Sequence, residues 1–499
     1  MRLIFFPGDI SGFSDISPGF RDGASVKEGE TMDRKVDKKQ KTPQEVLRDV
    51  MRLCADCDTC RTMMEEDCAF FIELYRLVDQ EQEEGIPITE SQLRYLAELC
   101  TLCGLCPCPK VPMDVMEAKT RYVEREGLPL ATRLLNDVPR MARLCGTFPR
   151  LVKAMQENKI LGPLLRKATR IHPDRQWPSF PQQNFFKWAA AKGLDKPQNG
   201  DHQVAYFVGC TAGYLFPQIG RSVVEILQHN GANVYVPPQQ CCGMPFLVEG
   251  DRNRTLQLAR TNMEKLLESV RGGDDLIYSC PTCGFFLKRL LKDRAYYSDV
   301  FQKSVNAVEG ELKVPAPEKG ENQFWHLKKS MYHDILKDDG YFSSIDPMDR
   351  IQLADHLFDF GIYLARLHAE GKLATDFAPL PERMAYFAPC HLREQKMGRP
   401  YLDLLKMVPG LDIEEVGSDY DCCGMGGIFG FKEHFHQKSL DLGAPLMKKI
   451  RAHDPQAIVT DCMSCRLQFS HCLPYPVYHP VEVLARAYRS EGSQVNRQE

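Results

Sequence analysis

Ten cysteines between residues 210 and 465 form the same pattern twice. Each copy has a single cysteine, then a Cys-Cys-Gly-Met tetrapeptide, then a Cys-x-x-Cys pair. The first copy consists of Cys210, Cys241, Cys242, Cys280 and Cys283, and the second of Cys390, Cys422, Cys423, Cys462 and Cys465. The flanking residues repeat as well, since VAYFVGC ends the run before one copy and MAYFAPC the run before the other. The copies lie about 180 residues apart, so a unit of this length has been duplicated.

Five clustered thiols indicate iron–sulfur chemistry. Soft sulfur ligands select iron–sulfur clusters or zinc, and a tetrahedral zinc uses only four. The competing interpretation is a pair of structural zinc ribbons built on the two Cys-x-x-Cys pairs, which leaves the Cys-Cys pairs without a role. Disulfides fit less well, because 20 cysteines in 499 residues are far below the density of a secreted disulfide scaffold. We therefore expect metal-bound thiolates in both copies.

A second group of cysteines lies upstream, in the runs CADCDTC and CTLCGLCPCP with one cysteine between them. Its members are Cys54, Cys57, Cys60, Cys68, Cys100, Cys103, Cys106 and Cys108. Three cysteines at Cys-x-x-Cys-x-x-Cys spacing hold a cubane [4Fe-4S] cluster, and in two-cluster ferredoxins the fourth ligand comes from the other motif, usually before a proline. The group resembles such a ferredoxin. The predicted sets are Cys54, Cys57, Cys60 and Cys108 for one cluster, and Cys100, Cys103, Cys106 and Cys68 for the other.

The fourth ligands are the open part of this assignment. Cys108 stands before Pro109, as expected, but only two positions after Cys106. Cys68 comes later after Cys60 than the usual motif has it, and no proline follows it. Cys68 is therefore either the fourth ligand or a spectator, whose cluster takes another ligand or is a three-iron form.

The residues around these cysteines predict two kinds of domain. Apolar residues in the 69–100 stretch recur at helical spacing, and residues 89–92 have the form of a capping box, so we expect an all-helical module there. In each copy of the repeat, short apolar runs precede the cysteines; they lie at 204–208, 234–236 and 276–278, and at 384–388, 413–416 and 457–459. Helical stretches separate these runs, which predicts parallel α/β units with the cysteines beyond the carboxyl ends of the strands.

We therefore expect an α+β multidomain protein, with an N-terminal α-helical ferredoxin module followed by two duplicated α/β Cys-Cys-Gly domains. The predicted ranges are a flexible tail at 1–45, the ferredoxin domain with two [4Fe-4S] clusters at 46–130, a basic amphipathic linker at 131–200, the first Cys-Cys-Gly domain at 201–320, a helical connector at 321–380 and the second Cys-Cys-Gly domain at 381–490.

This combination resembles a family of iron–sulfur proteins. APCHLREQKMG, DCCGMGGIFGFKE, LGAPLMKKI, IVTDCMSC and YHPVEVLARAY are similar to the iron–sulfur C subunit of anaerobic glycerol-3-phosphate dehydrogenase, and the likeness covers roughly residues 50–490. Its relatives are the glycolate oxidase iron–sulfur subunit and the B and C subunits of heterodisulfide reductase. The resemblance implies that each set of five cysteines can hold a noncubane [4Fe-4S] cluster, so the Cys-Cys-Gly domains hold one or two.

The glycines beside the double cysteines suit such a site. Gly243 and Gly424 remove a Cβ where we expect the backbone to pass close to a cluster. The run GMGGIFG from residue 424 can offer amide N–H donors to cluster sulfurs. His391, next to Cys390, is either a donor to a cluster sulfur or a hydrogen-bonded structural histidine.

Composition and charge exclude several classes of protein. The net charge of −4 argues against a nucleic-acid binder, and no apolar stretch approaches the roughly 20 residues that a transmembrane helix needs. Residues 1–13 contain too short an apolar run, and are too acidic and too poor in basic residues, for a signal peptide. We expect a cytoplasmic protein, with peripheral contact to the cytoplasmic face of the membrane left open.

That possibility rests on residues 143–188, where basic side chains lie among apolar and aromatic ones. The basic residues are Arg143, Arg150, Lys153, Lys159, Arg166, Lys167, Arg170, Arg175 and Lys187. This composition is typical of a membrane-surface anchor. It equally fits a linker that packs its apolar face on the cluster domains.

The predicted function is an electron-transfer subunit of an anaerobic dehydrogenase complex. The chain has neither a GxGxxG nor a P-loop motif, so we expect no flavin or nucleotide site of its own. It would therefore take electrons from a flavoprotein partner. It would deliver them to a quinone or another acceptor. The alternative is a heterodisulfide-reductase-like catalytic subunit that reduces a disulfide at a noncubane [4Fe-4S] cluster. Both use the same cysteines, and no separate catalytic residue is predicted.

Overall fold

The computed structural model describes residues 41–489 apart from 65–66, 148–151, 153, 156–157, 159, 179, 198–202, 321–322 and 333–335. Most of the predicted tail lies outside the described residues. The first helix, α1 (Pro43–Cys57), begins inside that predicted range, because Thr42 and Glu45 form a capping box and Pro43 occupies the first turn.

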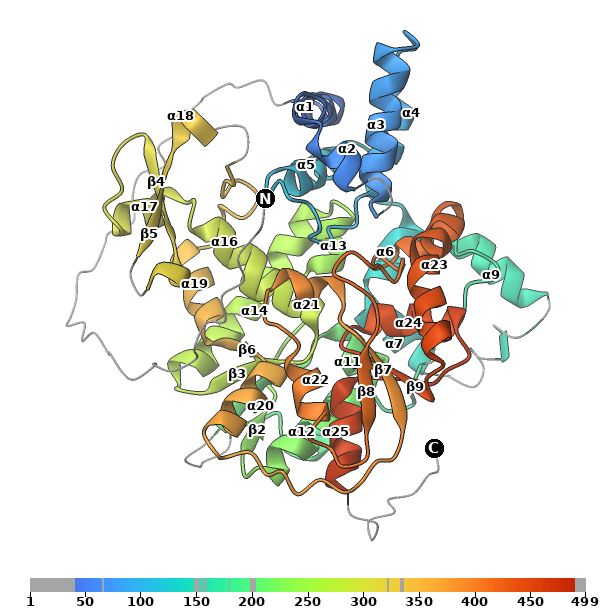
Figure 1. The fold of residues 1–499 in the computed structure, drawn as a ribbon, viewed down its shortest axis with the longest axis vertical. Coiled ribbons are helices and arrows are strands. Elements are labelled where there is room, and N and C mark those ends of the chain that lie inside the picture. The colour runs from blue at the N-terminus through green and yellow to red at the C-terminus, as the bar shows by residue number, and fades with distance from the viewer. Residues whose placement is uncertain are drawn as a thin grey trace.

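The 46–130 range is helical, as predicted. It contains α1, α2 (Thr59–Met63), α3 (Ala69–Gln82), α4 (Glu90–Leu99) and α5 (Val111–Glu126). The predicted capping box at α4 is present, with Thr89 accepting from the Gln92 backbone. Helix α1 packs on α5 and α3 on α4, burying Leu47, Leu74 and Leu96 completely. Figure 1 shows these helices at the upper end of the molecule.

The 131–200 range consists of short helices and connections. The helices are α6 (Leu130–Asn136), α7 (Val138–Gly146), α9 (Leu161–Thr169) and α10 (Phe185–Ala191). Between α9 and α10, Ile171 forms an isolated antiparallel bridge with Lys432. The linker is therefore hydrogen-bonded to the second half of the chain.

Two parallel sheets confirm the predicted α/β units. The first has the order β2-β1-β3-β6 and the second β10-β9-β7-β8. The strands of the first are β1 (Gln203–Phe207), β2 (Asn233–Tyr235), β3 (Asp275–Tyr278) and β6 (Leu357–Asp359). Those of the second are β7 (Arg383–Phe387), β8 (Asp412–Glu415), β9 (Ala457–Thr460) and β10 (Val477–Tyr478). Each predicted apolar run is a strand, and the duplication extends to a fourth strand that the pattern did not indicate.

Helices cover both sheets and carry the connections. In the first unit they are α11 (Cys210–Tyr214), α12 (Pro217–His229), α13 (Met244–Val248) and α14 (Arg252–Arg271). In the second they are α21 (Cys390–Glu394), α22 (Pro400–Leu405), α23 (His436–His453), α24 (Met463–Cys472) and α25 (Pro480–Tyr488). The 3-10 turns η3 (Phe429–Phe431) and η4 (Glu433–Phe435) precede α23.

A long excursion separates β3 from β6. It contains α15 (Pro281–Gly284), the π-helix η1 (Phe285–Leu290), α16 (Leu291–Ala295), α17 (Asp299–Ser304), β4 (Glu311–Pro315), η2 (Pro317–Lys319), β5 (Phe324–Lys328), α18 (Lys329–Tyr332) and α19 (Pro347–His356), and α20 (Phe360–Ala369) follows β6. Strands β4 and β5 form an antiparallel hairpin. The range predicted as a helical connector, 321–380, thus holds β5 and β6 as well as helices. Strand β6 completes the first sheet.

The two units share one helical layer. Helix α12 of the first packs against α25 of the second, and α22 contacts both α20 and α25, as Figure 1 shows. His479, the buried N-cap of α25, links the units, because its Nε2 lies 3.0 Å from the carbonyl oxygen of Ser279. This layer fixes the carboxyl ends of both sheets relative to each other. None of the described helices is long and apolar enough to cross a membrane.

Candidate metal centres

The duplicated cysteines lie where the strands end, as predicted. Cys210 begins α11 just after β1, and Cys280 is the N-cap of α15 just after β3. In the second unit Cys390 begins α21 after β7, and Cys462 is the N-cap of α24 after β9. Carboxyl ends of parallel strands meet at one edge of a sheet, so each set of cysteines converges.

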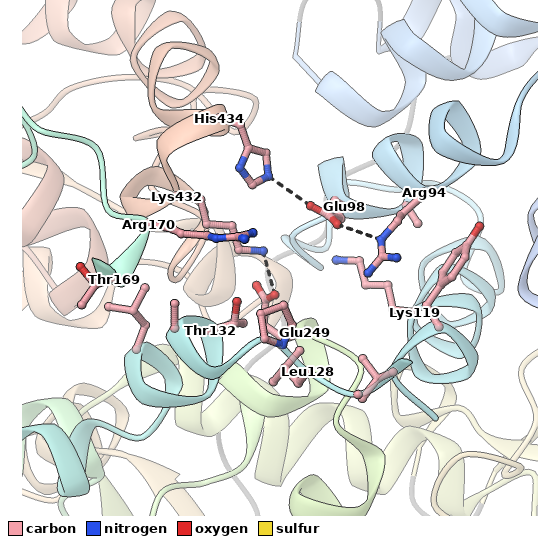
Figure 2. A pocket seen from close by; sticks show the side chains of 17 residues that line it. Arg94, Glu98, Lys119, Leu128, Thr132, Thr169, Arg170, Glu249, Lys432 and His434 are labelled. Atoms are coloured by element: carbon pink, nitrogen blue, oxygen red, sulfur yellow. Dashed lines mark hydrogen bonds and ion pairs between the residues drawn. The ribbon is translucent and has the colours of Figure 1, made fainter. Parts of the chain in front are cut away.

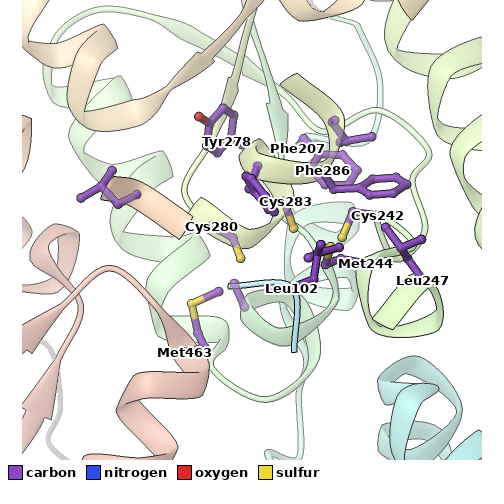
Figure 3. Close-up of a cluster of buried hydrophobic side chains, with 14 of the residues drawn as sticks. Leu102, Phe207, Cys242, Met244, Leu247, Tyr278, Cys280, Cys283, Phe286 and Met463 are labelled. Carbon is purple, nitrogen blue, oxygen red and sulfur yellow. The ribbon is translucent and has the colours of Figure 1, made fainter. Parts of the chain in front are cut away.

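In the first copy, pairs of sulfur atoms are in contact. The Sγ atoms of Cys210 and Cys241 lie 3.5 Å apart. A Cβ on Gly209 would lie 3.0 Å from the Cys283 sulfur, so this glycine admits a thiol against the backbone. Figure 3 shows the sulfurs of Cys242, Cys280 and Cys283 turned toward one space.

In the second copy a different pair of sulfur atoms is in contact. The Sγ atoms of Cys423 and Cys465 lie 3.2 Å apart. The backbone N–H of Gly424 donates to the Cys422 sulfur at 3.2 Å. Such donors tune the potential of a sulfur-ligated site.

The second cysteine of each Cys-Cys pair has the most stabilised thiolate. Hydrogen bonds from Cys241 and Cys283 lower the pKa of Cys242. The same contacts, from Cys422 and Cys465, lower the pKa of Cys423. A thiolate is the form that binds metal.

Helix packing also requires the glycines that follow the Cys-Cys pairs. The φ of Gly424 is +85°, and a Cβ would lie 2.0 Å from the carbonyl oxygen of Ser439 in α23. Gly243 likewise has a φ of +111°, and a Cβ there would lie 3.2 Å from the carbonyl of Thr255 in α14. What lies against both glycines is helix backbone, which packs on the loop behind the cysteines.

The two sets of cysteines face each other across one cavity of about 120 Å³. The cysteines that line it are Cys210, Cys242, Cys280 and Cys283 from the first copy, Cys390, Cys422, Cys423, Cys462 and Cys465 from the second, and Cys103 from the N-terminal part. Soft sulfur atoms around a cavity are the donor set that iron–sulfur clusters use. Among the described side chains, no three of Cys, His, Asp or Glu form a compact group for a single metal ion.

The N-terminal cysteines influence one another electrostatically. Burial and then the neighbouring Cys60, Cys108 and Cys57 raise the pKa of Cys54 to about 12. Burial and then Cys100, Cys103 and Cys68 raise the pKa of Cys106 well above its usual value.

The second N-terminal group surrounds a cavity of its own. That cavity has a volume of about 50 Å³ and is lined by Cys68, Cys100, Cys103 and Cys106, with Cys422 beside them. The structure therefore brings Cys68 to the group to which the sequence assigned it.

His391 connects three parts of the chain. Its Nε2 lies 3.1 Å from the carbonyl oxygen of Leu102, and its Nδ1 lies 2.9 Å from the hydroxyl of Thr282. Because the carbonyl can only accept, Nε2 carries the proton and Nδ1 accepts from Thr282. Both nitrogens are occupied and burial lowers the pKa of His391 to about 4, so the histidine is the structural one of the two alternatives.

Several polar residues that support the cysteines were not predicted. The Gln239 side chain accepts from the backbone N–H groups of Val208 and Gly209, ahead of Cys210. Asn262 donates to the carbonyl of Cys241 at 2.9 Å. A glutamine just before a Cys-Cys pair was visible in the sequence, but nothing in its spacing marks the interaction.

Arg175 belongs to the interior and not to a basic surface. Its side chain is 1% exposed and donates to Gln468 at 2.7 Å and to the Met425 sulfur at 2.9 Å. Its inclusion among the basic residues of a surface segment was therefore wrong. The charge composition of the segment did not distinguish Arg175 from its neighbours. The partners that hold it inside, Gln468 and Met425, lie far away in the sequence.

The apolar residues in the remainder of the 143–188 segment are of two kinds, buried and exposed. Phe185 is fully buried and packs edge-on against Tyr206 of β1, as the linker interpretation predicts. Leu144 and Leu164 are 63% and 62% exposed, so α7 and α9 keep an apolar surface uncovered. Arg150, Lys153 and Lys159 lie outside the described residues.

Comparison with a family model identifies the duplicated units. The model described as "Cysteine-rich domain" matches residues 204–288 and 384–470. The two matches contain the ten duplicated cysteines and most of both parallel sheets.

The chain is also similar to several known proteins. It is 26% identical over 380 residues to the C subunit of anaerobic glycerol-3-phosphate dehydrogenase from Escherichia coli (strain K12), covering 76% of this chain and 82% of the relative. It is 26% identical over 302 residues to the B subunit of fumarate reductase (CoM/CoB) from Methanothermobacter marburgensis, covering 59% of this chain and 48% of the relative. It is 22% identical over 429 residues to an uncharacterized iron–sulfur protein of Methanocaldococcus jannaschii, covering 83% of this chain and 66% of the relative.

Proposed function

We propose that this chain, which carries two copies of the cysteine-rich domain and is homologous to the C subunit of anaerobic glycerol-3-phosphate dehydrogenase, is the iron–sulfur electron-transfer subunit of a dehydrogenase complex. Electrons would enter at the N-terminal ferredoxin-type helices from a flavoprotein partner. They would leave through the cysteine-rich domains to a quinone or another acceptor.

One observation supports this proposal above all others, namely that the cysteine groups adjoin one another in series. Cys60 of the first N-terminal group contributes to the raised pKa of Cys106 in the second. Cys103 of the second group lines the same cavity as Cys390 and Cys422 of the second cysteine-rich domain. That cavity continues to the cysteines of the first domain, so cysteine sulfurs of three of the four groups border it.

The residues fit the groups that the family implies. Each cluster would be held by four cysteines in an N-terminal group or by five in a cysteine-rich domain, since sulfur ligands of this kind hold [4Fe-4S] clusters. Such clusters, when bound, accept and release single electrons. In the cysteine-rich domains the chain would shield them from water, because Cys210, Cys242, Cys423 and Cys465 are all at most 6% exposed.

The proposal is tested by spectroscopy of the anaerobically purified, reduced protein. Because Cys103 lies between the N-terminal cysteines and the second domain, we expect electron paramagnetic resonance to show magnetic coupling between those centres. Cys103→Ser is expected to remove this coupling and to leave the signal of the cysteine-rich domains in place.

The matched control is Cys145→Ser, which changes a half-buried cysteine outside every motif. We expect it to leave the coupling unchanged. Uncoupled signals in the unmodified protein, or equal effects of the two substitutions, would contradict a series arrangement.

A quinone acceptor requires access to a membrane surface, and we propose that α6, α7 and α9 supply it. Leu130, Leu144 and Leu164 are 72%, 63% and 62% exposed, and the exposed Arg143 and Lys167 lie on α7 and α9. Exposed leucines insert into the interface, while each basic residue gains about 1 kcal/mol near an anionic surface.

Sedimentation with anionic liposomes tests the membrane contact. Leu164→Asp is expected to abolish binding, and high salt to weaken it. Val308→Asp is the control, because Val308 is 65% exposed and lies in the excursion before β4. Absence of binding in the unmodified protein, or equal losses in both variants, would show that the exposed leucines are no anchor.

The cavity between the two sets of cysteines supports a second candidate function. It is lined by sulfurs of both copies and by Thr282 and Ser464, so a disulfide substrate could lie there. Its reduction to two thiols would take two electrons from the reduced clusters and two protons from solvent. Reduction of a small disulfide by the reduced protein, with no reduction of a quinone analogue, would favour this function over the first.

A further inference from the structure

A cavity of about 280 Å³ lies where several parts of the chain meet, apart from the cysteine cavities. Its basic residues are Arg94 of α4, Lys119 of α5, Arg170 at the end of α9, and Lys432 and His434 beside η4. Its acidic residues are Glu98 and Glu249. Figure 2 shows Arg170 and Lys432 entering from one side and Arg94 and Lys119 from the other.

The carboxylates are already engaged. Glu249 pairs with Lys432 at 2.7 Å, and Glu98 lies 3.6 Å from Arg94 and 3.3 Å from His434. Arg94 has a further partner, Glu126, outside the cavity. Neither acidic side chain of the cavity is paired with Arg170 or with Lys119.

Lys119 is a buried donor. It is 7% exposed, and its Nζ donates to the carbonyls of Cys100 and Val248 at 2.7 Å and 2.9 Å. An ammonium group has three N–H donors, so these two bonds leave one. The two carbonyl partners take two of its hydrogen bonds without neutralising its charge.

Arg170 is held beside Lys432 by the backbone. Ile171 bridges Lys432, and the N–H of Glu433 donates to the carbonyl of Arg170 at 3.0 Å. No hydrogen bond or ion pair of the Arg170 guanidinium is found within the described part of the chain.

We infer that this cavity binds a phosphate monoester. The cationic groups approach from opposite sides, and Thr132 adds a hydroxyl from a third direction. A tetrahedral dianion can accept from all of these directions at once, and guanidinium groups suit phosphate especially well. Leu128 and Leu135 form an apolar wall, which suits the short carbon chain of an ester. The inference does not depend on the proposed electron transfer.

Titration calorimetry of the anaerobically purified full chain with inorganic phosphate and with ethyl phosphate tests the site. We expect one saturable site per chain for both probes. Arg170→Gln is expected to weaken binding about tenfold or more, since charge-assisted hydrogen bonds are lost. The control, Lys192→Gln, removes an equal charge from an exposed position at the end of α10 and is expected to change the affinity less than about twofold.

Vesicles containing phosphatidic acid distinguish a lipid headgroup from a soluble ester. Vesicle binding that ethyl phosphate displaces and that Arg170→Gln weakens would assign the site to a lipid, and soluble binding alone would assign it to a metabolite. Absence of saturable phosphate binding in the unmodified protein, or equal losses in the two variants, would overturn the inference.

Discussion

Replacing Gly424 by alanine tests how the Cys-Cys loop is held. The Cβ would lie 2.0 Å from the Ser439 carbonyl oxygen and 3.0 Å from the Gly443 nitrogen, at a φ of +85°. The left-handed conformation costs a side chain about 1–2 kcal/mol. The overlap adds an overpacking cost of about 1–3 kcal/mol, because its partners are helix backbone that cannot rotate away. We therefore expect a loss of roughly 3 kcal/mol or more, with release of the metal bound by the second domain.

Gly427→Ala in the same loop is the matched control. Its φ is +68°, but nothing lies within 4 Å of the added Cβ, so only the conformational cost of about 1–2 kcal/mol applies. Anaerobic urea unfolding, followed by circular dichroism and visible absorption, measures both variants. Equal losses would mean that the contact with α23 does not constrain the loop, and the reasoning from Ser439 would be wrong.

The remaining predictions concern single side chains. Cys423→Ser is expected to remove about one cluster's iron and to leave the N-terminal signals intact, because each copy has its own five cysteines; loss of all iron would show that the sites depend on one another. Thr282→Val leaves the buried Nδ1 of His391 without a donor and should cost about 1–3 kcal/mol in anaerobic unfolding, whereas an unchanged midpoint would refute the tether. Burial raises the pKa of Asp359 from 3.8 to about 7, so the folded state retains a proton that the unfolded chain has lost, and stability falls as the pH rises through this window. Asp359→Asn should therefore stabilise the protein by about 1 kcal/mol more at pH 8 than at pH 6, and an equal gain at both values would count against this assignment.

Much of the cysteine-rich fold could be predicted, because each strand before a cysteine is a distinct apolar run. The runs at 204–208 and 384–388 became β1 and β7, with one residue of difference at their ends. The fourth strands were missed because β6 and β10 are only three and two residues long. Their pairing is set by tertiary contacts and leaves little periodicity in the sequence.

The candidate sites could be predicted as sets but not as an arrangement. Spacing grouped the cysteines because ligands of one cluster come from few chain segments. That the two sets face one cavity depends on the packing of α12 on α25, whose residues lie far apart in the sequence. The burial of Arg175 could not be predicted either, because its partners Gln468 and Met425 are distant in the sequence. A basic residue near aromatic ones fits a surface or an interior equally well.

The metal content of the anaerobically purified protein tests the central claim most directly. Four [4Fe-4S] clusters predict roughly sixteen irons and sixteen acid-labile sulfides per chain, with little zinc. Two or more zinc ions per chain with little iron and no labile sulfide would contradict the account, and would assign the two Cys-x-x-Cys pairs to structural zinc sites instead.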